Sequence, residues 1–198
     1  MVAKAAHANR SFLGTLDFQT RLFIAWTLFV AFCQCAGWTL SALHSLNAIG
    51  YAISLIIFFG ALGFSFAKSN AFNRFNKRPL LKRLKRPFPL AFLILTAMAI
   101  LGGALYLPNN FDGLAYRTPR VLNWLAEGQW HWIHSHVGNL NTRGAAFEWI
   151  TAPLFALTKT DRLEFLINAI CFLFLPGRIF AVLTRLGVRP RVAWHWMW

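Results

Sequence analysis

Long apolar stretches alternate with cationic stretches along this chain. Residues 22–67 contain no Asp, Glu, Lys or Arg. A helix needs about 20 residues to cross the roughly 30 Å of hydrocarbon in a bilayer, so this stretch is long enough for two spans. The segment His44-Ser45-Leu46-Asn47, with three polar residues of four, separates them. We therefore expect helices over about 22–43 and 48–67 that form a tight hairpin.

Two more apolar stretches follow. The uncharged stretch 88–107 predicts a third span, and the stretch 161–184 predicts a fourth. Asp161, with Glu164 three residues later, is typical of a capped helix start. Residues 192–198 contain three Trp, which is typical of a further span that begins at the membrane interface. The expected fold is all-α and polytopic, with four transmembrane helices and the start of a fifth.

The segment 108–160 between the third and fourth spans is long for a connector and predicts two helices lying in the membrane interface. For the first, Thr118 is the expected N-cap, Pro119 the first helical residue and Gly128 the terminator. The second covers about 144–157, where Pro153 is expected to kink or end its first part.

The chain is accordingly divided into three parts. These are a tail and hairpin (1–67), a basic loop (68–87) and a module (88–198) that includes the long loop 108–160.

Composition agrees with a membrane protein and excludes a soluble domain. Hydrophobic residues make up 57% of the 198 residues and charged residues 13%, against about 45–50% and about 25% in soluble domains. The mean hydropathy is +0.48. Three Cys are too few for a disulfide scaffold.

The distribution of charge predicts orientation. There are 20 Lys and Arg against 6 Asp and Glu, and the segment 68–86 contains eight cations and no acid. Cytoplasmic loops are enriched in such cations, so we expect this segment and the N-terminus inside and residues 108–160 outside. Cations between apolar runs favour contact with anionic lipid headgroups over nucleic acid.

The long loop carries the candidate chemistry. Asp112, just after the third span, could be a general base or a ligand of a divalent metal; the alternative is an exposed turn residue. Arg117 and Arg120 have planar guanidinium groups that suit a lipid phosphate, on a substrate or on ordinary anionic lipid.

Histidines and a further acid extend this set. His131, His134 and His136 are types of residue that bind zinc, but no fourth ligand follows from the spacing, and a role as polar lining or interface anchors is the preferred alternative. Glu148 lies in an apolar segment, so it should face a polar cavity, pair with a cation such as Arg143, or face solvent.

The sequence from Asp112 to Gly128 resembles the first outer loop of bacterial GT-C-fold glycosyltransferases, which are similar to protein O-mannosyltransferases and lipid A aminoarabinose transferases. Residues 141–148 and 161–163 resemble the second interfacial helix of that family and the start of its next span. The resemblance covers roughly 88–198. Many relatives have His directly after the Tyr, where this chain has Arg117.

The resemblance implies a bacterial inner-membrane enzyme that transfers a sugar, with inversion, from a polyprenyl-phosphate donor to an extracytoplasmic glycan, lipid or protein acceptor. It implies Asp112 as the catalytic base, and a divalent metal is the one cofactor considered. The expected substrate-binding residues are Tyr116, Arg117, Arg120, His134, His136, Arg143 and Glu148.

Since residues 192–198 predict only the start of a fifth span and the family has more spans, we expect the chain to be the N-terminal part of a longer protein. The alternative is a genuine short product that ends in an interfacial tail. The rival hypothesis is a non-catalytic fragment or assembly partner that binds anionic lipid. A transporter is less favoured, because the first three spans contain no ionisable Asp, Glu, Lys or Arg.

Overall fold

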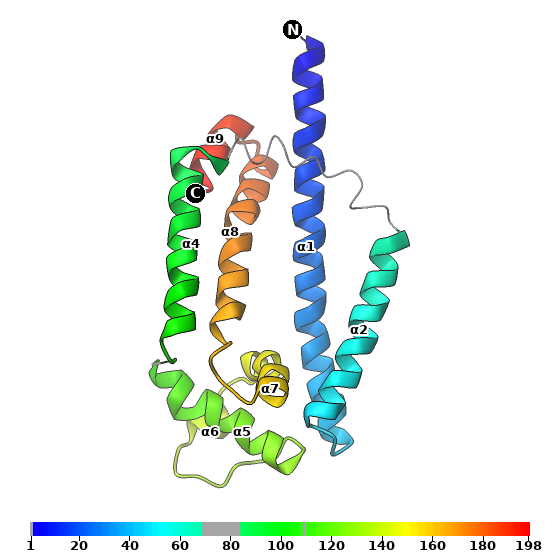
Figure 1. Cartoon of the computed structure of the whole chain (residues 1–198), viewed down its shortest axis with the longest axis vertical. Coiled ribbons are helices and arrows are strands. Elements are labelled where there is room, and N and C mark those ends of the chain that lie inside the picture. Colours follow the sequence, from blue (N-terminus) through cyan, green and yellow to red (C-terminus); the bar gives the residue numbers. More distant parts are fainter. Residues whose placement is uncertain (1, 69–83, 109) are drawn as a thin grey trace. The chain divides into compact units, whose positions relative to one another are not determined.

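The computed structural model describes residues 2–68, 84–108 and 110–198, and within these ranges every regular element is a helix (Figure 1). Four of the described helices are long and apolar enough to cross a membrane. They are α1 (Val2–Ala42), α2 (Ala48–Lys68), α4 (Pro87–Leu105) and α8 (Phe165–Arg185). The predicted all-α fold with four long apolar helices is confirmed. The predicted basic loop lies mostly outside the described residues.

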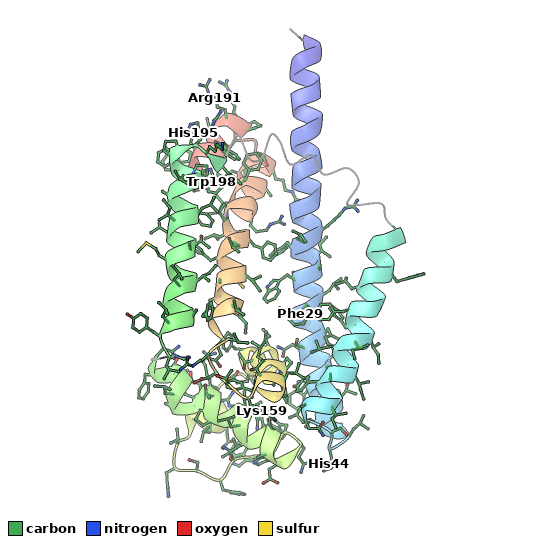
Figure 2. All side chains as sticks on the ribbon, in the orientation of Figure 1. Phe29, His44, Lys159, Arg191, His195 and Trp198 are labelled. Carbon is green, nitrogen blue, oxygen red and sulfur yellow. The ribbon has the colours of Figure 1, made fainter. Side chains whose placement is uncertain are left out.

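The turn between α1 and α2 falls where the polar residues predict it. Asn47 begins α2 by accepting a hydrogen bond from the Gly50 N–H at 3.0 Å, which satisfies a helix-end amide that has no partner inside the helix. Gly50 is required there, since a Cβ would lie 2.3 Å from the Ser45 carbonyl oxygen. Phe29 on α1, which Figure 2 labels, packs against Phe58 and Phe59 of α2 and so closes the hairpin.

Four shorter helices follow α4: η2 (Gly113–Arg117), α5 (Thr118–Glu127), α6 (Asn139–Thr142) and α7 (Ala146–Thr158). The chain is helical without a break from 111 to 127, so the prediction that Thr118 is an N-cap is wrong. The Thr118 N–H donates to the Gly113 carbonyl, five residues back, and Pro119 has no N–H to satisfy. No cap is needed at that point. Gly128 ends α5 as predicted, with φ of 70°.

Two other predicted helix boundaries differ from the structure. Pro153 lies inside α7, so of the two predicted effects it does not end the helix, while a kink there stays a prediction. The residues on both sides of it, from Thr151 to Ala156, are mostly buried, and their packing holds the helix together. Residues 161–164 form a turn in which the Glu164 N–H donates to the Asp161 carbonyl at 3.1 Å, so α8 begins at Phe165 and Asp161 is not its N-cap.

The chain divides into two compact units. One comprises residues 1–25, 65–102 and 166–198, and the other comprises 26–64 and 103–165. The core of the second unit is aromatic: Trp149 stacks on Trp124 at 4.8 Å between ring centroids and contacts Trp38 at 5.0 Å. A Cβ on Gly37 would lie 2.3 Å from the Trp149 ring, so α1 and α7 approach closely there.

The first unit holds α9 (Pro190–Trp196), the place where the sequence predicts the start of a fifth span. The seven-residue helix buries Ala193, and Met197 just after it, in a small cluster with Phe180 of α8. The ring centroids of Trp198 and Phe92 of α4 are 5.5 Å apart, and Phe92 stacks on Phe172 of α8 with 4.8 Å between centroids. Continuation into a further span stays a prediction.

Candidate functional site

Asp112 lies in the first turn of the helical stretch that follows α4. That stretch begins at Phe111, and the Asn110 side chain caps it by accepting a hydrogen bond from the Gly113 N–H. The Asp112 side chain is exposed, and no described residue donates a hydrogen bond to its carboxylate. A free, solvated carboxylate beside the end of an apolar helix is in a position to accept a proton from a substrate.

The next turn is the π-helical segment η2. Its i→i+5 hydrogen bond from Thr118 to Gly113 widens the helix locally, a feature frequent at functional sites. The turn ends with Tyr116, which is buried, and Arg117, which is half-buried. The Arg117 guanidinium lies 5.2 Å from the centroid of the Phe147 ring and 5.7 Å from that of Tyr116. No described residue forms a hydrogen bond with this guanidinium, which leaves its donors for a ligand.

Arg120 occupies a different environment, since it is fully enclosed. Its side chain is 1% exposed and that of Glu148 is 0% exposed, and Nη1 of Arg120 donates to Oε1 of Glu148 at 3.1 Å. Nη1 also donates to the carbonyl of Arg143 at 3.1 Å, and Nη2 to that of Asn139 at 2.6 Å. Arg120 therefore ties α5 to residues 139–148. Glu148 has its cationic partner in Arg120, while the Arg143 side chain is exposed.

Two carboxyl groups in this region, those of Glu148 and Glu164, have pKa values above the ordinary value of a glutamate. Burial raises the pKa of Glu148, an effect opposed by Arg120 and Arg117. Burial also raises the pKa of Glu164 to about 7, helped by the negative charge of Asp161 and opposed by Arg117. The charge of Glu148 raises the pKa of Glu164 further, so the charges of Arg117, Glu148 and Glu164 act on one another.

The sequence predicts that Glu164 belongs to a helix cap, and it does not point to Glu164 as a site residue. The signal that could have found it is an acid placed directly before an apolar span, where ionisation is costly unless a cation is near.

Glu164 should make stability depend on pH. Its pKa in the folded protein, about 7, lies above the ordinary value of 4.5. Between these values the folded state binds the proton more tightly than the unfolded state, so the free energy of unfolding falls as pH rises. Glu164→Gln has no such carboxyl. Its midpoint temperature should therefore fall less than that of the wild type between pH 5 and pH 8, as measured by thermal unfolding in detergent.

Glu127→Gln, which removes an exposed carboxyl from the same unit, is the matched control and should keep the wild-type pH profile. An identical pH profile in Glu164→Gln and wild type would show that Glu164 is ionised in the folded protein at all of these pH values.

The histidine loop, residues 129–138, is fastened to the rest of its unit. The Trp130 N–H donates to Ser41 Oγ at 2.7 Å, and Asn141 makes two hydrogen bonds with the backbone of Ile133, at 3.0 and 2.7 Å. His134 and His136 lie on this loop, and both are exposed. In the ranges that the structure describes, no three metal-binding side chains come together, which leaves the metal hypothesis without geometric support.

The two hydrogen bonds between the Asn141 side chain and the Ile133 backbone should fix the conformation of the loop. In Asn141→Ala the Ile133 N–H and carbonyl lose their partners, at a cost of about 1–3 kcal/mol in the free energy of unfolding. Amide hydrogen exchange at residues 130–137 should become faster. Asn123→Ala is the control, since the exposed Asn123 side chain donates to the Pro119 carbonyl within its own helix. Unchanged exchange in Asn141→Ala would mean that other contacts hold the loop.

The fold defines the class as far as the described residues go: their regular elements are all helical, and four of the helices are long and apolar enough to cross a membrane. Comparison of the chain with protein-family models, with curated proteins and with solved structures finds no match.

Proposed function

We propose that the chain is part of an integral-membrane glycosyltransferase that takes a sugar from a polyprenyl-phosphate donor and passes it to an extracytoplasmic acceptor. The observation that carries the proposal is that the Asp112 carboxylate and the Arg117 guanidinium, neither with a hydrogen-bond partner among the described residues, lie on one helical segment directly after an apolar helix. A base and a phosphate ligand at the end of a span are what transfer from a lipid phosphate requires. The motif resemblance from Asp112 to Gly128 adds to this support.

The proposed mechanism is a direct displacement. Asp112 accepts the proton of the acceptor hydroxyl or amine as that group attacks the anomeric carbon, and the bond from this carbon to the donor phosphate oxygen breaks with inversion. The phosphate leaves with the electron pair and gains negative charge. Arg117 stabilises that charge, and this electrostatic stabilisation is strongest where water is excluded.

Burial divides the other candidate residues by role. Arg120 has its donors directed at Glu148 and at backbone carbonyls, so in this proposal it is a positioning residue that holds the Arg117 segment, and Glu148 acts through it. Tyr116 is buried beside both arginines and supports them. The exposed side chains His134, His136 and Arg143 are left to contact the acceptor or the donor.

The test is donor-dependent release of polyprenyl phosphate by membranes that contain the full-length protein, with polyprenyl-phosphate-linked sugars supplied as candidate donors. Arg117→Ala should lower kcat/KM for the donor about tenfold or more, with a higher KM and a lower kcat, since it removes a charged hydrogen-bond partner of the phosphate and the cation that stabilises the leaving charge. Arg117→Lys should recover part of the loss because the point charge remains. The exposed Arg162→Ala is the matched control and should leave KM unchanged.

Failure to release polyprenyl phosphate from any donor, by protein that is correctly inserted, would contradict the proposal. It would favour the rival function, a non-catalytic membrane protein that assembles with a partner or binds anionic lipid.

A further inference from the structure

Arg178 is a cation inside a membrane-spanning helix. It lies seven residues before the end of α8 at Arg185, which is about 10 Å along the helix axis. The side chain is half-buried, and the two residues before it, Pro176 and Gly177, are buried. A charged side chain at such a depth is costly and is generally retained for a function, with a partner that compensates its charge.

The guanidinium of Arg178 turns toward the beginning of the apolar part of α1. Nη2 lies 3.4 Å from the Thr20 hydroxyl oxygen, and Cζ lies 4.6 Å from the centroid of the Phe23 ring. Thr20 is the first residue of the membrane-spanning part of α1. The long side chain thus carries its charge from the interior of the span to the level where the hydrocarbon ends, which is where headgroup phosphates begin.

The charge of Arg178 is not compensated by the described residues of its unit. Nε is buried and has no hydrogen-bond partner among them. The sequence of this unit has one acid, Asp17, whose side chain lies outside the described residues. Arg185 adds a second positive charge two helical turns further on, on the same face of α8. Two cations and a hydroxyl at the end of a span form a set of donors that suits a phosphate.

We propose that Arg178, Arg185 and Thr20 form a binding site for the headgroup phosphate of an anionic phospholipid. The planar guanidinium of Arg178 and the Thr20 hydroxyl donate to phosphate oxygens, while Arg185 contributes charge at the rim. The acyl chains lie along the aromatic surface formed by Phe23 and Phe174, whose ring centroids are 5.8 Å apart. This site lies at the Arg185 end of α8 and does not depend on the proposed transferase activity.

Retention of lipid by the purified full-length protein tests the site. The protein is reconstituted in nanodiscs of phosphatidylcholine with a small fraction of phosphatidylglycerol, and the co-purified lipid is measured by native mass spectrometry. Arg178→Gln should lower the apparent affinity for phosphatidylglycerol about tenfold, as expected for loss of a charge-assisted hydrogen bond. Arg178→Lys should give an intermediate loss. The matched control is Arg189→Gln, an equal charge change at an exposed position, and should change affinity less than twofold.

Three outcomes would overturn the proposal. Equal losses in Arg178→Gln and Arg189→Gln would indicate diffuse attraction by the whole basic surface. Displacement of phosphatidylglycerol by millimolar inorganic phosphate would indicate a site for free phosphate. If Asp17→Asn and Arg178→Gln lowered thermal stability equally and left lipid retention unchanged, Asp17 would be the partner of Arg178. Should Arg178→Gln not fold, Arg178→Lys and Arg185→Gln give the same comparison.

Discussion

Asparagine in place of Asp112 is expected to lower the rate of sugar transfer about 10²–10⁴-fold, the usual effect of removing a general base. Asparagine has nearly the same shape and keeps one carbonyl oxygen, but it cannot accept the proton of the acceptor. Because the Asp112 carboxylate is exposed and receives no hydrogen bond from a described residue, its replacement should not alter folding or insertion. The measurement is turnover of the full-length enzyme with a saturating polyprenyl-phosphate donor.

Glu127→Gln is the matched control for this variant. Glu127 is an exposed acid on α5, in the same unit, and its replacement should leave turnover nearly unchanged. Near-normal turnover in Asp112→Asn would refute the assignment of the base. An equal fall in both variants would trace the effect to folding and would also remove the support for Asp112.

The second large effect is on stability. Arg120→Ala should lower the free energy of unfolding by roughly 3–5 kcal/mol, because it leaves the Glu148 carboxylate buried without its hydrogen-bonded cationic partner. The carbonyls of Asn139 and Arg143 lose their donor in the same variant. Glu148→Ala should lower the free energy of unfolding by a similar amount, since it leaves the Arg120 guanidinium buried without a carboxylate partner. Unfolding of the purified protein in detergent, followed by Trp fluorescence, measures both changes.

The double variant Arg120→Met/Glu148→Leu distinguishes charge from packing. Replacing both partners by apolar residues removes the stranded charge, so much of the stability lost in either single variant should return. Arg143→Ala is the control, since only the backbone carbonyl of Arg143 takes part and its side chain is exposed. A single variant with wild-type stability would mean that the pair contributes nothing net.

The long helices could be predicted from the sequence because their cause is local. The bilayer sets a length of about 20 apolar residues, and the uncharged stretch 22–67 is too long for one span. Gly128 could be recognised for the same reason, since its left-handed φ favours glycine wherever a helix must end. Thr118 was misassigned because the real cap, Asn110, lies further back and the π turn carries the helix through Pro119.

The site was predicted less completely because its contacts join distant residues. Arg120 and Glu148 are 28 residues apart, and only the packing of α5 against α7 brings them together. Nothing in the spacing separates the buried Arg120 from the more accessible Arg117, three positions earlier on the same helical stretch. The roles assigned to Asp112, Arg117 and the loop histidines stay predictions, as do the donor, the acceptor and the orientation of the spans.

The approach of Gly37 to Trp149 has a consequence for biosynthesis. Gln34 on α1 donates a hydrogen bond to the Ala146 carbonyl at the start of α7, although 112 residues separate them in the sequence. At about 5–20 residues per second, a ribosome finishes α1 on the order of 6–20 s before α7 exists. During that interval α7 is absent, so the surface of α1 at Gly37 and Trp38, against which Trp149 later packs, is uncovered. The newly made hairpin therefore has this contact surface uncovered for several seconds, and the unit that contains residues 26–64 and 103–165 is complete only after α7 has been translated.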